Sequence, residues 1–226
     1  KHTVFVYFDL RYDFFPKSSE QFMVGMFYKR LKNPIEYGLL NEGQDTYYKP
    51  MNFGNATNLG VEVDVKKYFN WFGIKANYTY THSSITTEKR IMDGNDVKTC
   101  TQTRPLFGQA AHVANLSLLF KSTKYGWEGQ IAGSYTGKRL SDISNWYDDD
   151  IWEDGYMQLD ASVEKSFKNG ISLFAKASNL LDTPLLRFIQ NGPRTENVNS
   201  ERNNGNVIER KELHGQSFML GIRYKL

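Results

Sequence analysis

A short aromatic and acidic segment, residues 144–154, holds the side chains of this sequence that are best suited to binding chemistry. Its candidate ligand contacts are Trp146, Tyr147, Asp148, Asp149, Asp150 and Trp152. Carboxylates supply the oxygen ligands that Ca²⁺ takes in sets of about six to eight, and indole rings can stack on a sugar or an aromatic ligand. The spacing of an EF-hand loop is not met, because no glycine stands at its sixth position and no glutamate at its twelfth. A solvated loop whose aromatic side chains pack on neighbouring loops explains the same residues, so both interpretations stay open.

Catalytic constellations do not stand out elsewhere. The four histidines are His2, His82, His112 and His214, and none has a second histidine at the spacing of a helical or hairpin metal site. The single cysteine, Cys100, excludes an internal disulfide and a cysteine-based zinc site. We therefore expect a protein that is not an enzyme and holds no cofactor, apart from Ca²⁺ in the acidic segment.

Composition limits the class of protein further. The 226 residues are 40% hydrophobic and 15% aromatic, with a net charge of +3. The net charge is small, and acidic and basic residues are evenly mixed along the chain, so the sequence gives no basic surface for nucleic acid. The mean hydropathy is −0.56, and no run approaches the roughly 18 to 20 apolar residues of a membrane-spanning helix. A membrane β-barrel stays compatible, because half of each of its strands faces a polar lumen.

Apolar and polar side chains alternate along most of the chain. In residues 71–81, apolar or aromatic side chains occupy the even positions from Phe72 to Tyr80, as in a strand with one apolar face. About nine such runs reach the ~9 to 11 residues that a tilted strand needs to cross a bilayer. Charges recur on the polar face, which is ordinary in a hydrated lumen and unusual in a dry core. The residues expected to face the lumen, or a plug within it, are Glu62, Asp64, Lys66, Lys75, Glu128, Asp160 and Glu164.

The connections between these runs alternate in length. Short turns at 16–19, 68–70, 122–126 and 168–170 alternate with long connections at 33–52, 84–107, 141–154 and 184–212. Bacterial outer-membrane barrels have short turns on one rim and long loops on the other, whereas a soluble sandwich has mostly short turns at both ends. Aromatic residues flank the short turns, as the interfacial girdles of such barrels do.

The chain ends inside a strand pattern. Its apolar face carries Phe218, Leu220, Ile222, Tyr224 and Leu226, which is typical of the terminal strand of a barrel. About nine strands is an odd number, while single-chain bacterial barrels close with an even number. We therefore interpret residues 1–226 as the C-terminal portion of one larger antiparallel transmembrane β-barrel, whose earlier strands lie upstream.

Three segments resemble the TonB-dependent receptors of the Gram-negative outer membrane. Residues 177–182, Ala-Ser-Asn-Leu-Leu-Asp, are similar to the Asn-Leu-Phe/Leu-Asp segment near the penultimate strand of that family. Residues 104–109, Arg-Pro-Leu-Phe-Gly-Gln, followed by Asn115, resemble an element that opens a late strand in one branch of it. Residues 221–226 are similar to the family's C-terminal assembly signal, with Leu226 where the family usually ends in Phe.

The resemblance implies a barrel of about 22 strands with an N-terminal plug that actively imports a scarce nutrient, such as a siderophore, vitamin, glycan or peptide. The implied partners are the TonB complex, acting through the plug, the barrel-assembly machinery, outer-membrane lipid and lipopolysaccharide, and a surface lipoprotein. The implied location is the outer membrane of a Gram-negative bacterium, with the C-terminus in the periplasm. A passive porin and a structural, secretion or adhesin barrel stay open as alternatives on these residues.

Overall fold

A computed structural model describes residues 2–42, 45–190, 202–203 and 206–224. Its regular elements are all strands: β1 (Val4–Phe14), β2 (Gln21–Lys32), β3 (Ile35–Glu42), β4 (Asp45–Asn52), β5 (Asn55–Phe69), β6 (Phe72–Asp93), β7 (Asp96–Arg104), β8 (His112–Ser122), β9 (Trp127–Thr136), β10 (Arg139–Ser144), β11 (Ile151–Glu153), β12 (Tyr156–Ser166), β13 (Ile171–Ser178), β14 (Leu185–Ile189), β15 (Arg202–Asn203), β16 (Asn206–Glu212) and β17 (Ser217–Tyr224). The described residues contain no helix that is long and apolar enough to cross a membrane.

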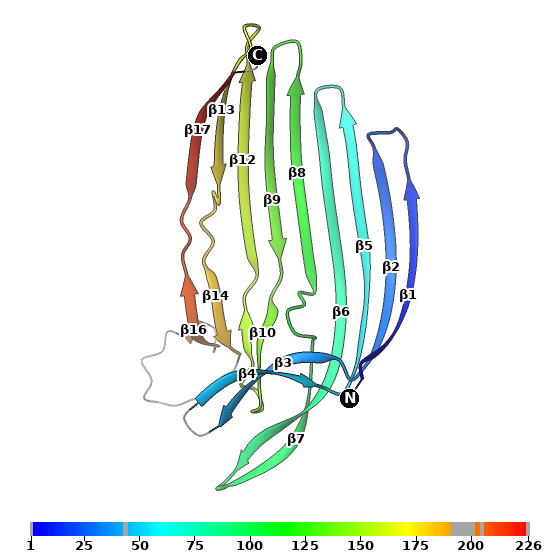
Figure 1. Cartoon of the computed structure of the whole chain (residues 1–226), viewed down its shortest axis with the longest axis vertical. Coiled ribbons are helices and arrows are strands. Elements are labelled where there is room, and N and C mark those ends of the chain that lie inside the picture. The colour runs from blue at the N-terminus through cyan, green and yellow to red at the C-terminus, as the bar shows by residue number, and fades with distance from the viewer. Residues whose placement is uncertain (1, 43–44, 191–201, 204–205, 225–226) are drawn as a thin grey trace.

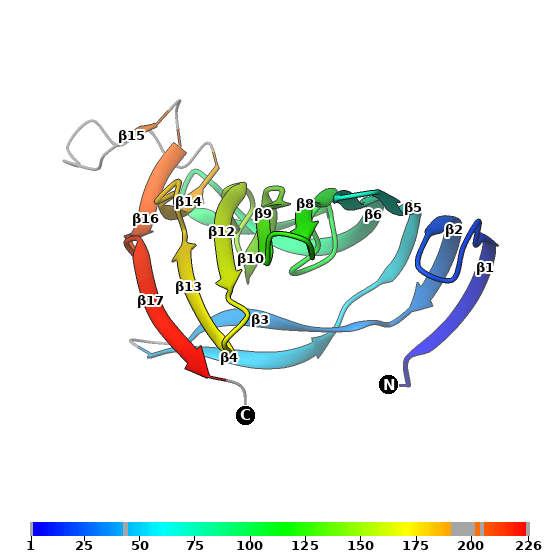
Figure 2. The same ribbon diagram turned by 90° about the horizontal axis from the view of Figure 1, so that it is seen from above.

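The main sheet is an antiparallel meander. Its strands follow the order β1-β2-β5-β6-β8-β9-β12-β13-β17, and β7 pairs with β6 outside this path. The sheet curves through an open arc whose two edges are β1 and β17 (Figure 2). This confirms the prediction of about nine long antiparallel strands, which do not close into a barrel in the described part of the chain.

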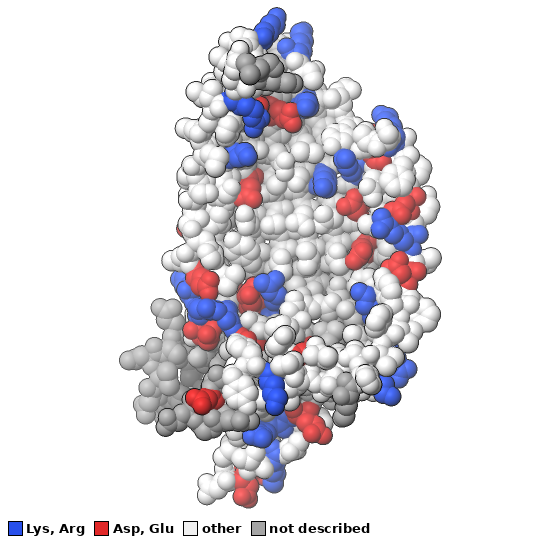
Figure 3. Space-filling model, viewed as in Figure 1, with Lys and Arg blue, Asp and Glu red and all other residues white. Residues whose placement is uncertain are grey.

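The two faces of the arc differ as the alternation predicts. The register places apolar side chains of neighbouring strands opposite one another, as with Val61 and Tyr80, or Ile131 and Ala161. Many of them are exposed, up to 84% for Leu220, and so much exposed apolar surface is typical of a face that meets lipid. Figure 3 looks into the concave side, where acidic and basic side chains are interspersed over β1, β2 and β5.

Short turns and long connections lie at opposite ends of the sheet (Figure 1). The short turns fall at 15–20, 70–71, 123–126 and 167–170, as predicted. Aromatic rings gather beside them: Phe69 stacks on Phe72 with centroids 4.7 Å apart, and Trp71 meets the Phe120 ring edge-on at 6.3 Å. This cluster fits the predicted interfacial girdle, since amphipathic rings are favoured where a membrane meets water.

The long connections differ from the prediction that they are loops, because they contain strands. The β3–β4 hairpin crosses the concave side of the arc (Figures 1 and 2). β6 continues far beyond the predicted end at residue 81 and pairs with β7. A second sheet forms in the order β15-β16-β14-β11-β10-β3-β4. Pairing between connections satisfies backbone groups that would otherwise be buried without hydrogen bonds.

The chain turns sharply after β13, and the residue types at this corner explain its backbone conformation. Asn179 and Asp182 have positive φ angles of 56° and 47°, a conformation that asparagine and aspartate tolerate better than most residues. The Asn179 side-chain amide donates to the Gly215 carbonyl at 2.7 Å, and its backbone N–H donates to Asp160 Oδ1 at 2.9 Å. The corner therefore ties β12 to β13 and to the segment that enters β17.

Candidate functional site at the long-connection end

The long connections form a packed layer, which we call the long-connection layer: residues 33–54, 82–111, 137–155 and the described residues of 179–216. The apolar side chains of Ile85, Leu140 and Ile143 are buried within it. β10 pairs in parallel with β3, joining Ile143 to Gly38 and Ser144 to Leu39. Connections that are distant in the sequence therefore share one core at this end of the sheet.

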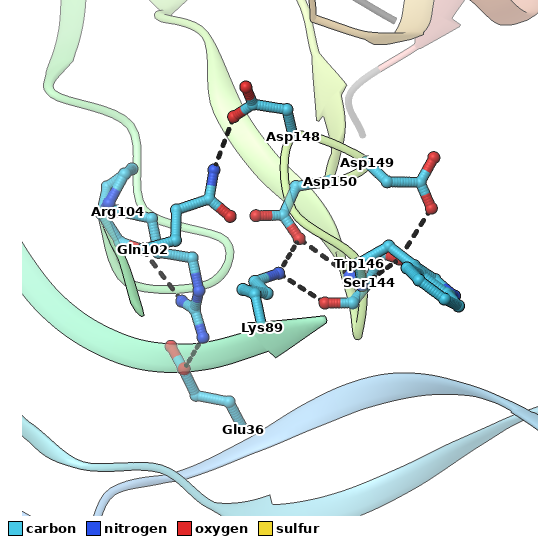
Figure 4. Close-up of polar contacts among 10 residues, drawn as sticks. Glu36, Lys89, Gln102, Arg104, Ser144, Trp146, Asp148, Asp149 and Asp150 are labelled. Atoms are coloured by element: carbon cyan, nitrogen blue, oxygen red, sulfur yellow. Dashed lines mark hydrogen bonds and ion pairs between the residues drawn. The ribbon is translucent and has the colours of Figure 1, made fainter. Parts of the chain in front are cut away.

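Glu36 anchors the β3–β4 hairpin. Its Oε2 lies 2.8 Å from Arg104 Nη2, and both side chains are buried. Figure 4 shows the contact with Arg104. The backbone N–H of Phe107 donates to Glu36 Oε1 at 2.7 Å, so both carboxylate oxygens have partners. A buried charge needs such complete pairing to offset its desolvation. The Arg-Pro-Leu-Phe segment is thus the docking point of the hairpin.

Asp150 pairs with Lys89 of β6 inside the layer. The Lys89 ammonium donates to Asp150 Oδ1 and to the Ser144 carbonyl, and the Ser144 N–H donates to the same Asp150 oxygen at 2.8 Å. Burial lowers the pKa of Lys89, and the charge of Asp150 opposes that shift. Asp150 therefore holds the 144–154 segment against β6.

The other carboxylates of this segment point to different partners (Figure 4). Asp148 accepts from Gln102 Nε2 at 2.9 Å, and Asp149 accepts from the Ser144 hydroxyl at 2.7 Å. Across the described ranges, no three histidine, cysteine, aspartate or glutamate side chains are grouped so that they could hold a metal ion. The three carboxylates thus have different partners, and calcium binding by this segment stays a prediction.

The aromatic residues of the segment are placed differently from one another. Trp146 is half-buried and forms an isolated parallel bridge with Arg90. Tyr147 is exposed, and its N–H donates to the Arg90 carbonyl at 2.9 Å. Trp152 is half-buried, and the Lys138 ammonium lies 4.7 Å from the centre of its ring. Of the three, only Trp152 lines the cavity described next.

A cavity of about 330 Å³ lies between β7 and the β10–β11 connection. Among its lining side chains are Gln102, Arg104, Lys138, Asp148, Trp152 and Gln190. The predicted contacts Asp148, Asp150 and Trp152 line the cavity, whereas the sequence pattern did not point to Gln102, Arg104, Lys138 and Gln190 as site residues. Gln102 and Arg104 occupy alternate positions of β7, so extending the period-two pattern past residue 81 would have placed them on the inner face.

The charged residues predicted to face the lumen, from Glu62 to Glu164, all lie opposite the apolar face. Glu128 stands directly across from Glu164, a repulsive arrangement for like charges. Each carboxylate has a basic partner on its other side, Lys121 at 2.8 Å from Glu128 and Arg223 at 3.1 Å from Glu164. Lys66 and Lys75 also face one another. The wall therefore carries charges of both signs, and two of its carboxylates are paired with basic side chains of other strands.

The apolar residues of the final strand have the predicted orientation. Phe218, Leu220, Ile222 and Tyr224 are exposed on alternate positions of β17, opposite the outer-face residues of β13. Leu226 lies outside the described residues. β17 ends at the same end of the sheet as the short turns (Figure 1).

An open antiparallel meander with an apolar outer face, short turns at one end and long connections at the other defines part of an outer-membrane type of β-barrel. Residues 6–180 match the family model described as TonB dependent receptor-like, beta-barrel, and the chain belongs to this family. No curated relative matches the sequence.

Solved structures show the same fold at low identity. A mutant of the ferric enterobactin receptor PfeA from Pseudomonas aeruginosa, in complex with enterobactin, is 15% identical, with a TM-score of 0.57 over 97% of this chain and 31% of that chain. The copper transporter OprC is 13% identical, with a TM-score of 0.55 over 81% of this chain and 26% of that chain. The chain thus spans less than a third of the length of these receptors.

Proposed function

We propose that the full-length protein is an outer-membrane receptor that imports a scarce nutrient with energy from the TonB complex, and that it is not an enzyme. The observation that carries the proposal is the long-connection layer on a sheet of this family. Buried ion pairs tie these connections into one surface at the end where an imported molecule would first arrive. A preorganised surface favours ligand binding, because mobile loops would have to become ordered and the entropy lost would lower the affinity.

The proposed arrangement extends beyond these residues. The strands would belong to a barrel of about 22 strands, and a plug would contact the charged wall that includes Glu62, Asp64, Lys66, Asp160 and Glu164. The short turns and the C-terminus would face the periplasm of a Gram-negative bacterium. The apolar face of β17 would be recognised by the barrel-assembly machinery and then meet outer-membrane lipid, with lipopolysaccharide beside the long connections and a surface lipoprotein over them.

The nutrient belongs to the proposal as well. The names of the similar structures bring an iron-bearing siderophore and copper into consideration for this chain. Sequence identities of 13% to 15% indicate a shared fold but not a shared ligand specificity. Vitamins, glycans and peptides therefore stand beside metal-containing ligands as candidate cargo.

Growth on limiting nutrients tests the proposal. The strain that encodes the full-length protein is compared with strains lacking either this gene or the gene for TonB, on limiting iron chelates, cobalamin, oligosaccharides and peptides. We expect the two deletions to remove growth on the same nutrient. A passive porin would give growth that does not depend on TonB, and an adhesin would change attachment without changing uptake; either result contradicts the proposal.

A further inference from the structure

We propose that the outer face of the sheet holds a site for one anionic phospholipid, whose acyl chains lie in an apolar groove over β8 to β17 and whose phosphate meets Lys165. The groove has a volume of about 860 Å³, within the ~300–1,000 Å³ that small-molecule sites occupy. The inference goes beyond the proposed import function, because it concerns the face that meets the membrane and not the cargo.

Side-chain size produces the groove. Three alanines on β12 and β13 form its floor: Ala161 and Ala177 lie opposite one another, and Ala175 lies beside them on the same face of β13. Larger side chains border this floor, with Phe120 on β8 and Leu220 on β17, directly across from Ala175. An apolar hollow between large apolar side chains, on a face that is otherwise exposed, is suited to hydrocarbon chains.

Lys165 stands at the short-turn end of the groove. It follows Val163, a groove residue, on the same face of β12, roughly 7 Å further along the strand. Its ammonium lies 5.1 Å from the centre of the Trp127 ring and donates to the Tyr125 carbonyl. A lysine on a lipid-facing surface is costly unless its ammonium reaches the membrane interface, and the aromatic rings beside it are typical of that level.

The neighbouring short turns add positive charge. The turns at 123–126 and 167–170 contain Lys124 and Lys168 and no acidic residue. The contact of Lys165 with the Tyr125 carbonyl joins β12 to the first of these turns, where the Lys124 ammonium lies 5.2 Å from the centre of the Tyr125 ring. Among the described residues, no ion pair includes any of these three lysines.

This distribution of charge selects the occupant. An anionic phospholipid has a phosphate directly above its acyl chains, and the site has basic residues directly beside an apolar groove. Lysine ammonium groups bind phosphate through charge-assisted hydrogen bonds, and clusters of basic residues at a membrane surface favour anionic lipids. Phosphatidylethanolamine carries an ammonium group that offsets its own phosphate, so we expect it to bind more weakly than phosphatidylglycerol.

Native mass spectrometry of the purified full-length receptor in detergent tests the site, with phosphatidylglycerol and phosphatidylethanolamine as probes. Ala175→Phe fills the groove with a side chain that points out of the sheet. Its control is Ala76→Phe, on the outer face of β6 opposite Val65 and outside the groove. Lys165→Met removes the charge at the groove end. Its control is Lys32→Met, at an exposed position of β2 beside the long connections.

We expect one molecule of phosphatidylglycerol to bind about tenfold more tightly than phosphatidylethanolamine. Ala175→Phe should weaken the binding of both lipids about tenfold, and Lys165→Met should remove the preference for phosphatidylglycerol. Both controls should bind as the wild type does. The site is overturned if the wild type binds the two lipids equally, if Ala175→Phe binds phosphatidylglycerol as tightly as the wild type, or if Lys165→Met keeps the preference.

A photoreactive amino acid in place of Ala175 tests the occupant in the cell membrane. We expect the cross-linked adduct to have the mass of a phospholipid. An adduct with a protein or with a second copy of this chain would overturn the lipid assignment. TonB-dependent growth without a bound lipid would refute the lipid site alone, and lipid binding without such growth would refute the import function alone.

Discussion

Lys89 and Asp150, 61 positions apart in the sequence, form an ion pair in which both side chains are less than one-tenth exposed. The pair joins the extension of β6 to the acidic segment that precedes β11. A buried pair is a weak source of net stability, but removal of one partner leaves a charge without compensation. The pair therefore selects one arrangement of these connections over others.

Replacing Asp150 by Ala should loosen the long-connection layer. The change leaves the Lys89 ammonium buried without its counter-ion, a loss of about 3–5 kcal/mol in comparable sites. Hydrogen exchange of the full-length receptor should show faster exchange in residues 139–153 and no change in the meander. The control Asp149→Ala removes the acceptor of the Ser144 hydroxyl and a weaker charge interaction with Lys89, and should have a smaller effect. Equal protection in Asp150→Ala and the wild type would show that the pair does not hold the layer.

The stability of the layer should rise with pH in the alkaline range. Burial lowers the pKa of Lys89 below its usual 10.5, so between these two values the unfolded layer binds more protons than the folded layer does. Stability then increases with pH across that window, and Lys89 contributes no slope below it, where it is charged in both states. Thermal unfolding followed by tryptophan fluorescence measures this slope. In Lys89→Met the alkaline rise should vanish, and a wild-type midpoint that falls relative to this variant contradicts the assignment.

Glu36→Ala should release the β3–β4 hairpin from the concave side. The substitution leaves the Arg104 guanidinium and the Phe107 N–H without their acceptor, and losses of a buried charged partner cost about 3–5 kcal/mol. Limited proteolysis should cut within residues 33–54 sooner than in the wild type. Glu88→Ala, at an exposed position of β6, is the matched control and should leave the cleavage pattern unchanged. Wild-type cleavage rates in Glu36→Ala would show that the hairpin is held by other contacts.

Brominated lipids should quench the tryptophans of the short-turn end. Trp71 and Trp127 are exposed beside the short turns, where the girdle would meet the membrane interface. Trp146 and Trp152 belong to the long-connection layer. Single-tryptophan variants of the full-length receptor in vesicles should show strong quenching for the first two and weak quenching for the second two. Quenching of the opposite pair would reverse the assignment of the lipid-facing region.

The sequence predicts a strand correctly where the alternation of apolar and polar side chains can be seen within that strand alone. The even positions from Phe72 to Tyr80 alternate because a strand turns successive side chains to opposite faces. The prediction failed just beyond, where Thr87, Lys89 and Arg104 occupy inward positions that are buried. The even positions of the β6 extension, such as Thr86, Glu88 and Arg90, are polar as well. No apolar face marks the strand there, so the pattern predicts a loop.

The sequence by itself determined the meander, its two faces, and the separation of short turns from long connections, because alternation and turn residues are local properties of the backbone. Only the tertiary structure decided which connections meet. Glu36 pairs with Arg104, which is 68 positions away in the sequence. Asp142 accepts a hydrogen bond from Tyr48, which is 94 positions away. Such partners depend on how far each hairpin folds back over the arc. Ile85, Leu140 and Ile143 are buried where these connections meet, and no local pattern records that meeting.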